Sequence, residues 1–354
     1  AIIGFSELDE AVAVQKLPLG AKESDIVLPD TLEVELEEAD ETLAEDSQNV
    51  HLVEAVDKGT EKDTDAETAV WQISGITWKL DEEQSDLPEF HGGISEKDYF
   101  EEFDENGEKI LTTYDNDYKE MMMDIRVYRM KAGQTRTCLR TGEETAVLLL
   151  SGKITYEWEG NTETVSRKDV FTEGPWCVHV CTGKEIKVTA ETDAEILVQC
   201  TKNDVDFAGK LYKPEDAPWG YSCVGKFGNV AKRRVNTILD HDIAPYSNMV
   251  LGEVLNDKGN WSGYLPHRHP QPETYLFKFD RPEGFGASFV GDQVFKSVDN
   301  SFSAIPGGEL HPQAVAPGFQ MYTCWMIRHI DGNPWLQTDR CEDERYVWMH
   351  DAQF

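Results

Sequence analysis

The stretch from Gly259 to His311 contains four side chains whose types and spacing could bind a metal ion. His267 and His269 are two residues apart, so on a β-strand both imidazoles point to the same face. Glu273 follows four residues later, and His311 can return on an antiparallel neighbour. Three neutral imidazoles with one carboxylate suit Zn, Mn, Fe, Ni or Cu and leave coordination positions open for water or a substrate. The sequence therefore predicts one divalent metal ion held by His267, His269, Glu273 and His311.

The alternative interpretation is a pair of surface histidines beside an unrelated core histidine. An isolated HxH would favour that alternative. Here an HxHx3E pattern is followed by a PxGxxH pattern over residues 306–311. The combination is much more specific than either pattern alone and favours a metal site.

The elements that must position these residues are predicted to be short strands. Residues 125–130 and 154–158 alternate between apolar and polar side chains, and residues 145–150 form an apolar run typical of a buried strand. Similar segments recur from Gly225 onward, up to residues 321–328. Strands at such short spacing, separated by Gly and Asn, favour an antiparallel sandwich or barrel. Two halves of similar size and pattern predict a tandem of two related barrels.

Residues 1–90 differ in composition from the rest of the chain. They contain 25 Asp and Glu against 5 lysines and no arginine, a net charge of −20 out of −34 for the whole protein. Alternation at residues 32–36 and 76–80 predicts strands, and the acidic stretch 37–65 between them predicts a loop. The run 73–80 resembles β-rich repeats of surface proteins of Gram-positive bacteria. We expect an appended acidic β-rich segment without chemistry of its own.

Charge and cysteine content restrict the partners and the compartment. A net charge of −34 disfavours both nucleic acid and anionic membranes as partners. The sequence has no apolar run of transmembrane length and no signal peptide. Seven cysteines without a CxxC pair predict reduced, mostly buried thiols, which indicates a cytoplasmic protein. The acidic N-terminal segment leaves secretion as an alternative.

The two patterns around the proposed ligands resemble the signature motifs of cupins, small β-barrels with a metal inside. Their context resembles the 5-deoxy-glucuronate isomerase family of inositol catabolism, over roughly residues 98–354. The residues that carry this family resemblance are 142–152, 166–171, 259–269, 272–279, 284–286, 311–312 and 316–319. Two departures are Asn300, where the second motif has glycine, and Lys278, where arginine is commoner.

The resemblance implies an all-β bicupin, that is, two jelly-roll β-barrels. The expected domains are the acidic segment in residues 1–90, an N-terminal barrel in residues 91–212 and a C-terminal barrel in residues 213–354. The first barrel has no HxH, and His179, its one histidine apart from a residue in the lead-in, is expected to be a packing or surface residue. The resemblance therefore implies a single metal site, in the second barrel.

The activity implied by the resemblance is aldose–ketose isomerisation of a deoxy-uronic acid, from 5-deoxy-glucuronate to 5-dehydro-2-deoxy-gluconate. Such an enzyme moves a proton between adjacent carbons through an enediol, which a metal ion stabilises. Candidate catalytic residues are Tyr275, Lys278 and Arg328. Candidate substrate-binding residues are Tyr264, Gln293 and His350. For several of these a structural role is the alternative: barrel filling for Tyr275, an ion pair for Arg328, and a surface position for His350.

Three alternative functions remain open from the sequence. One is the related uronate ketol-isomerase of pectin breakdown. The others are a metal-binding cupin that holds a sugar acid without turnover and a dioxygenase with iron at the same ligands. The expected partner is a small sugar acid, and the exposed strand edges of cupins, which often lead to dimers, make a homodimer a further expectation.

Overall fold

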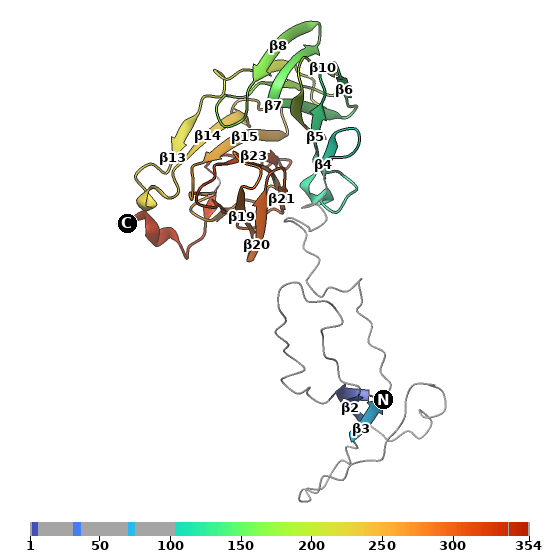
Figure 1. Ribbon diagram of the computed structural model, residues 1–354, viewed down its shortest axis with the longest axis vertical. Coiled ribbons are helices and arrows are strands. Elements are labelled where there is room, and N and C mark those ends of the chain that lie inside the picture. Colours follow the sequence, from blue (N-terminus) through green and yellow to red (C-terminus); the bar gives the residue numbers. More distant parts are fainter. Residues whose placement is uncertain (1, 6–30, 37–69, 75–102, 339, 353–354) are drawn as a thin grey trace, which may run out of the picture. The chain divides into compact units, whose positions relative to one another are not determined.

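The computed structural model of the chain (Figure 1) describes residues 2–5, 31–36, 70–74, 103–338 and 340–352. For the first three ranges it describes the backbone strands. The chain divides into two compact units, Ala1–Pro88 and Glu89–Phe354. In the part of the chain that is described, no helix is long and apolar enough to cross a membrane.

The described strands of the first unit form one antiparallel sheet. Its order is β1-β2-β3, made by Ile2–Phe5, Thr31–Leu36 and Val70–Ser74. The strand predicted at residues 32–36 is confirmed as β2. The strand predicted at 76–80 and the loop predicted at 37–65 lie outside the described residues.

The second unit begins with a barrel of antiparallel strands. Its main hydrogen-bonded path runs β12-β9-β7-β11-β5-β4; β8 and β10 also pair with β7, and β6 pairs with β10. The strands are β4 (Glu108–Thr112), β5 (Asp124–Met130), β6 (Thr135–Leu139), β7 (Glu143–Trp158), β8 (Asn161–Arg167), β9 (Cys177–Val180), β10 (Glu185–Ala190), β11 (Ala194–Lys202) and β12 (Lys210–Tyr212).

The long strand β7 connects the two faces of this first barrel. Its first half pairs with β9 and β11, and its second half pairs with β8 and β10. Gly152 lies between the halves with φ of +101°, and a Cβ there would lie 2.5 Å from the carbonyl oxygen of Asp193. Only glycine fits such a backbone at so close an approach.

The apolar run 145–150 in β7 is buried on both of its faces. Val147 and Leu149 belong to the core inside the first barrel, whereas Leu148 and Leu150 belong to a larger core that also contains Leu251 and other residues of the second barrel. Alternate side chains of one strand thus fill two different cores. This double burial explains why the run is continuous rather than alternating.

The second barrel is formed by two larger sheets and one short ladder. The sheets have the orders β13-β14-β15-β23-β18-β21 and β16-β22-β19-β20, and β17 pairs with β24. The strands are β13 (Gly220–Ser222), β14 (Arg233–Leu239), β15 (Met249–Asn256), β16 (Trp261–Ser262), β17 (His267–Arg268), β18 (Glu273–Phe279), β19 (Phe285–Val290), β20 (Gln293–Val298), β21 (Phe302–Ile305), β22 (Gln313–Val315), β23 (Met321–Arg328) and β24 (Cys341–Glu342). The unit Glu89–Phe354 also contains three short 3-10 helices among its described residues: η3 (Lys119–Met121), which precedes β5, η4 (Phe227–Asn229) and η5 (Val347–His350).

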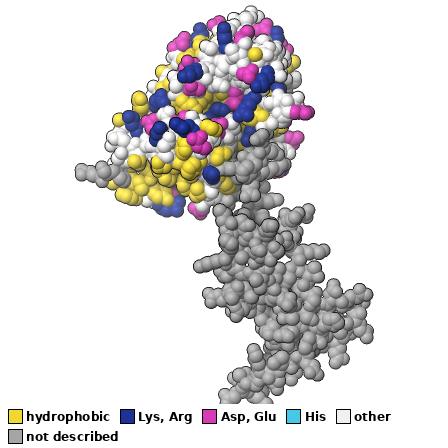
Figure 2. Space-filling model, in the orientation of Figure 1, with side chains coloured by type: hydrophobic (Ala, Val, Ile, Leu, Met, Phe, Trp, Pro, Cys, Tyr) yellow, Lys and Arg dark blue, Asp and Glu magenta, His cyan; other side chains and the backbone are white. Residues whose placement is uncertain are grey.

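The two barrels pack together within this unit (Figure 1), and one buried ion pair joins them. Nη1 of Arg167 lies 2.8 Å from Oε1 of Glu253, and both side chains are fully buried. Glu253 also accepts hydrogen bonds from the Tyr322 hydroxyl at 2.8 Å and from Nδ2 of Asn236 at 2.8 Å. On the outer surface, acidic and basic side chains are interspersed over the face shown in Figure 2.

Candidate metal centre

Four neighbouring segments of the second barrel bring the predicted metal ligands together. His267 lies on β17 and His269 directly follows it; both are buried, while Arg268 between them is exposed. Glu273 begins β18, where it is paired with Ile305 at the end of β21. The chain then turns through residues 306–308 and carries His311 back to the same place.

Three of these residues form a compact group, here called the His/Glu cluster: His269, Glu273 and His311. Their candidate ligand atoms all lie within 4.8 Å of one another, and all three side chains are buried. Oε2 of Glu273 is 3.2 Å from Nε2 of His269 and 3.3 Å from Nε2 of His311. His267 lies beside this group, its ring centroid 4.7 Å from that of His311.

Backbone carbonyls set the orientation of all three imidazoles. The Nδ1 atom of each histidine donates to a backbone carbonyl oxygen at 2.8–2.9 Å: His267 to Leu265, His269 to Gln271 and His311 to Glu309. With the proton on Nδ1, each Nε2 offers a lone pair. Nε2 of His311 is buried and has no hydrogen-bond partner among the described residues.

This donor set fits a divalent cation. Two Nε2 lone pairs and a carboxylate oxygen converge at 3.2–3.3 Å, an arrangement that is repulsive unless a cation or a proton lies between them. Burial, followed by the proximity of His311, lowers the pKa of His267 well below its usual value, and burial also lowers that of His311. Both imidazoles are therefore neutral at pH 7, the state in which imidazole binds a metal ion.

The His/Glu cluster faces a cavity of about 130 Å³ inside the second barrel. Its lining mixes aromatic, aliphatic and polar groups from β14, β15, β18 and β23 with residues from the C-terminal segment. The lining residues are Ser222, Arg233, Val235, Val254, Ser262, Gly263, His267, His269, Glu273, Tyr275, Gln313, Thr323, Trp325, Ile327, Trp335, Gln337 and Arg340.

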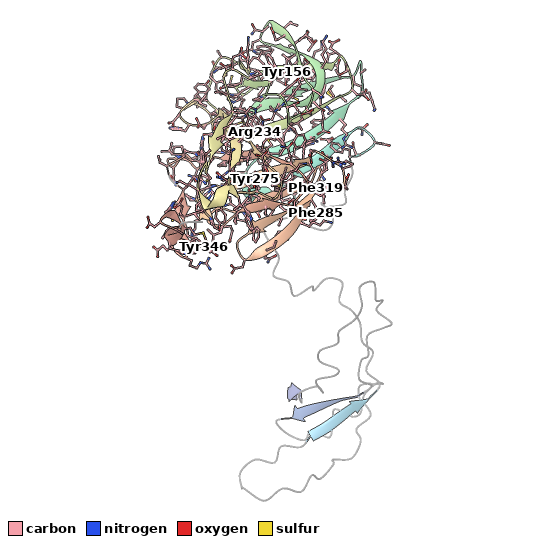
Figure 3. All side chains as sticks on the ribbon, turned by 60° about the vertical axis from the view of Figure 1, so that its left-hand side comes forward. Tyr156, Arg234, Tyr275, Phe285, Phe319 and Tyr346 are labelled. Atoms are coloured by element: carbon pink, nitrogen blue, oxygen red, sulfur yellow. The ribbon has the colours of Figure 1, made fainter. Side chains whose placement is uncertain are left out.

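Tyr275 is the one predicted catalytic residue that lines this cavity. It lies two residues after Glu273 on β18, and its ring centroid is 6.1 Å from that of His311. Figure 3 shows it among the strands of the second barrel. Its hydroxyl contacts the side chains of Gln313 and Glu273, and burial raises its pKa well above the usual value. The phenol is therefore protonated at neutral pH.

Lys278 and Arg328 do not line the cavity, because they lie on the opposite faces of their strands. On β18, the cavity side is taken by Glu273 and Tyr275, so the even-numbered Lys278 points the other way. Its Nζ donates to Glu195 of the first barrel and to Oδ1 of Asn300. Arg328 follows the lining residue Ile327 on β23 and donates to the carbonyl oxygen of His329.

The three residues predicted to bind substrate also lie outside the cavity lining. The Tyr264 hydroxyl contacts Sδ of Met349 at 3.4 Å, and its ring packs on Phe227 and Trp261. Gln293 begins β20 in the β19–β20 hairpin. His350 is exposed, with Nε2 2.6 Å from Oε2 of Glu342.

Arg233 and Arg340 are cavity residues that the sequence did not indicate. Arg233 is the first residue of β14 and only 4% exposed. Arg340 directly precedes β24, whose pairing with β17 fixes it beside His267, so that its Nη2 lies 3.2 Å from Nδ1 of that residue. A signal existed for Arg233, since it alternates with Val235 on a predicted strand. Arg340 carried no local signal.

In the first barrel, His179 is a packing residue. It is fully buried, its Nε2 lies 2.9 Å from Oε2 of Glu144, and its ring contacts that of Phe207. Among the described residues, the His/Glu cluster of the second barrel is the one group of this composition that could hold a metal ion.

The chain is similar in sequence to curated proteins over most of its two barrels. The chain is 28% identical over 242 residues to 5-deoxy-glucuronate isomerase of Bacillus subtilis (strain 168), a match that spans 61% of this chain and 85% of that protein. It is 29% identical over 216 residues to 5-deoxy-glucuronate isomerase of Geobacillus kaustophilus, spanning 56% of this chain and 76% of that protein.

Solved structures agree on the fold. An IolB-like protein from Salmonella typhimurium LT2 superposes with a TM-score of 0.59 at 21% identity, over 64% of this chain and 90% of that one. Oxalate decarboxylase of Lactobacillus farciminis, in a formate complex, superposes with a TM-score of 0.50 at 11% identity, over 70% and 86%. The predicted architecture, an all-β bicupin of two jelly-roll barrels with a further β-rich N-terminal segment, is confirmed. The model of the KduI/IolB family matches residues 99–349, and the chain belongs to that family.

Proposed function

We propose that this protein is a metal-dependent aldose–ketose isomerase that converts 5-deoxy-glucuronate to 5-dehydro-2-deoxy-gluconate in myo-inositol catabolism. The observation that carries the proposal is the convergence of Glu273 with Nε2 of His269 and of His311, next to the Tyr275 hydroxyl and to a cavity that Glu273, His269 and Tyr275 line. Membership of the KduI/IolB family and the names of the curated relatives supply the substrate class.

The residues that would hold the ion are His269, Glu273 and His311, with His267 as the fourth ligand. A divalent ion bound there would polarise the sugar carbonyl and stabilise negative charge on the neighbouring oxygen. The neutral imidazoles and the carboxylate leave room for substrate oxygens, because four protein ligands do not fill the coordination sphere of Zn, Mn, Fe or Ni in octahedral or five-coordinate geometry. The identity of the ion follows from metal analysis of the purified protein.

The reaction needs no external oxidant or reductant. The hydrogen on the carbon next to the aldehyde leaves as a proton, and a proton is delivered to the former aldehyde carbon, so that substrate and product are isomers. Tyr275 fits the role of the acid that donates a hydrogen bond to the developing enediolate oxygen, because its raised pKa keeps it protonated. We assign it that role and leave Lys278 and Arg328, whose side chains bond elsewhere, outside the reaction.

The proposal includes a cytoplasmic location and a small sugar acid as partner. All seven cysteines are free thiols, which fits a reducing compartment. A homodimer through strand edges, as in other cupins, is part of the same expectation and is tested by sedimentation of the purified protein.

The test is incubation of the metal-loaded protein with 5-deoxy-glucuronate, followed by NMR. We expect the aldehyde signal to be replaced by that of a ketone, with solvent deuterium incorporated at one carbon. If the protein isomerises the uronate of pectin breakdown and leaves 5-deoxy-glucuronate unchanged, it is the uronate ketol-isomerase instead. Oxygen consumption with iron and no isomerisation of any uronate would contradict the proposal and favour a dioxygenase, and binding without turnover would favour a sugar-acid binder.

A further inference from the structure

The cavity beside the His/Glu cluster carries more positive charge than the acidic chain around it would suggest. Its lining contains two guanidinium groups, Arg233 and Arg340, against one carboxylate, that of Glu273. That carboxylate is already directed at two histidines. Neither arginine forms an ion pair with any carboxylate of the described residues, although the protein as a whole carries a net charge of −34.

The hydrogen-bond contacts of both arginines are with groups other than carboxylates, so no negative charge among the described residues balances the two guanidinium groups. Nη1 of Arg233 donates to the carbonyl oxygen of Ala231 at 3.0 Å and to Sγ of Cys223 at 3.3 Å, neither of which is a carboxylate. Nη2 of Arg340 lies 3.2 Å from Nδ1 of His267, whose proton is directed at the carbonyl oxygen of Leu265, so this contact supplies no negative charge. Arg233 is buried and Arg340 is half-buried. Positive charges withdrawn from water without a counterion are costly, and an anionic ligand lowers that cost.

The topology separates Arg233 from the His/Glu cluster. Arg233 is on β14, and Glu273 is on β18, three strands away in the order β14-β15-β23-β18. The registered pairs Arg233–Asn256, Asn256–Met321 and Met321–Phe279 align Arg233 with the end of β18 opposite to Glu273, and both side chains line the cavity. An open-chain uronic acid likewise has its aldehyde at one end of the carbon chain and its carboxylate at the other end.

Resting on the proposed function, we propose that Arg233 and Arg340 bind the carboxylate of the substrate and make the site selective for sugar acids over neutral sugars. Arg233 lies away from the His/Glu cluster, and Arg340 lies beside His267. Guanidinium groups match carboxylates with paired, charge-assisted hydrogen bonds. The aldehyde end of the substrate then lies at the His/Glu cluster. The arginines act by binding and orienting the substrate, and they take no part in proton transfer.

The chain offers a matched control for Arg233. Arg234 is the next residue of the same strand, and its guanidinium lies over the ring of Trp219, outside the cavity lining. Figure 3 labels it. Arg234→Gln removes the same charge from the same strand and leaves the cavity unaltered. Arg345, which is paired with Asp343 at 2.7 Å, is the corresponding control for Arg340.

The experiment measures binding rather than turnover, so that it stands apart from the proposed function. Two cavity tryptophans, Trp325 and Trp335, report on ligands through their fluorescence. D-gluconate and D-glucitol share a carbon chain and differ by a carboxylate at one end, and each is titrated into the purified full-length protein. We expect wild type to prefer gluconate, and Arg233→Gln and Arg340→Gln to weaken gluconate binding by about 10- to 100-fold with glucitol binding unchanged. Arg234→Gln and Arg345→Gln should bind like wild type.

Two outcomes overturn the inference. One is a wild-type protein that binds acid and alditol equally. The other is an Arg233→Gln or Arg340→Gln variant that remains folded by circular dichroism and keeps the preference for gluconate. Arg233→Lys and Arg340→Lys guard against loss of folding, since they keep the charge and should retain part of the preference. If the preference depends on these arginines but no uronate is isomerised, the proposed function fails and this inference stands.

Discussion

The carbonyl oxygen of Pro270 occupies the place where a side chain on Gly307 would begin. A Cβ on Gly307 would lie 1.9 Å from that oxygen. The next residue, Gly308, donates its N–H to the carbonyl oxygen of His269 at 2.8 Å. The turn that precedes His311 is thus packed directly on the loop that joins His269 to Glu273, and the two halves of the His/Glu cluster are held in register by backbone contacts.

Replacement of Gly307 by alanine should therefore damage the metal centre. The clash is with backbone, which cannot move aside without displacing His269, so we expect a loss of about 2 kcal/mol or more in stability and weaker metal binding. Thermal unfolding and metal analysis measure both effects. Gly220→Ala is the control, since a Cβ there would have its nearest contact at 3.7 Å. Equal metal content and stability in Gly307→Ala would contradict the account of this turn.

Tyr275→Phe should lower turnover and leave the metal in place. The substitution removes only the hydroxyl that contacts Gln313 and Glu273. Loss of a general acid typically lowers the rate by a factor of about 100 or more. The measurement is kcat with 5-deoxy-glucuronate, beside metal content, and Tyr221→Phe on the exposed strand β13 is the control. A Tyr275→Phe enzyme with unchanged kcat would leave the tyrosine as barrel filling.

Stability should fall in acid because of His329. Its Nδ1 accepts a hydrogen bond from the backbone N–H of Trp335 at 2.9 Å, and burial, with His241 and Arg328 nearby, lowers its pKa to about 4. The unfolded chain, with a pKa of about 6.5 for this group, takes up the proton first as the pH falls. Neutral His329 therefore contributes about 3 kcal/mol to the free energy of unfolding above a pH of about 6.5, and this contribution is lost as the pH falls from about 6.5 to about 4.

His329→Gln isolates this effect, since the amide oxygen can still accept the Trp335 N–H and does not titrate. Denaturant unfolding of both proteins is measured between pH 7 and pH 4. Wild type should lose more stability than the variant over this range. Parallel curves would show that His329 is not the titrating group.

The buried pair Arg167–Glu253 should be sensitive to the loss of either partner. Removal of one charge leaves the other buried without compensation, which costs about 3–5 kcal/mol. Glu253→Gln should therefore destabilise the joined barrels strongly. The exposed pair Lys131–Asp193 is the matched control, and Asp193→Asn should cost less than about 1 kcal/mol. Chemical denaturation compares the two, and similar losses would argue against the buried pair as a support of the barrel interface.

The parts of the fold and site that the sequence indicated are those with local patterns. His267 and His269 are two residues apart, and this spacing is enough to predict that they face together; Glu273 joins them from the start of the next strand, β18. Asn300, which replaces a motif glycine, has φ of +63°, a left-handed conformation that asparagine tolerates better than most residues. The turn is therefore kept although the glycine is absent.

The rest of the site depends on strand pairing between distant segments. Arg340 is placed by the two-residue ladder between β24 and β17, which no periodicity in the sequence indicates. Lys278 and Arg328 could have been excluded by the same alternation that places Tyr275 and Ile327 in the cavity. The expected substrate contacts of Tyr264, Gln293 and His350 follow from the chemistry of their side chains, and the sequence does not show whether these side chains face the cavity.

The most direct test of the account is the metal content of the purified protein. Elemental analysis should find about one divalent ion per chain in wild type and almost none in His311→Ala or Glu273→Gln, because each substitution removes a ligand from the buried cluster. His241→Ala, a histidine outside the cavity lining, should retain the ion. A wild-type protein without stoichiometric metal, or a His311→Ala variant that keeps it, would contradict the central claim that these residues form a metal centre.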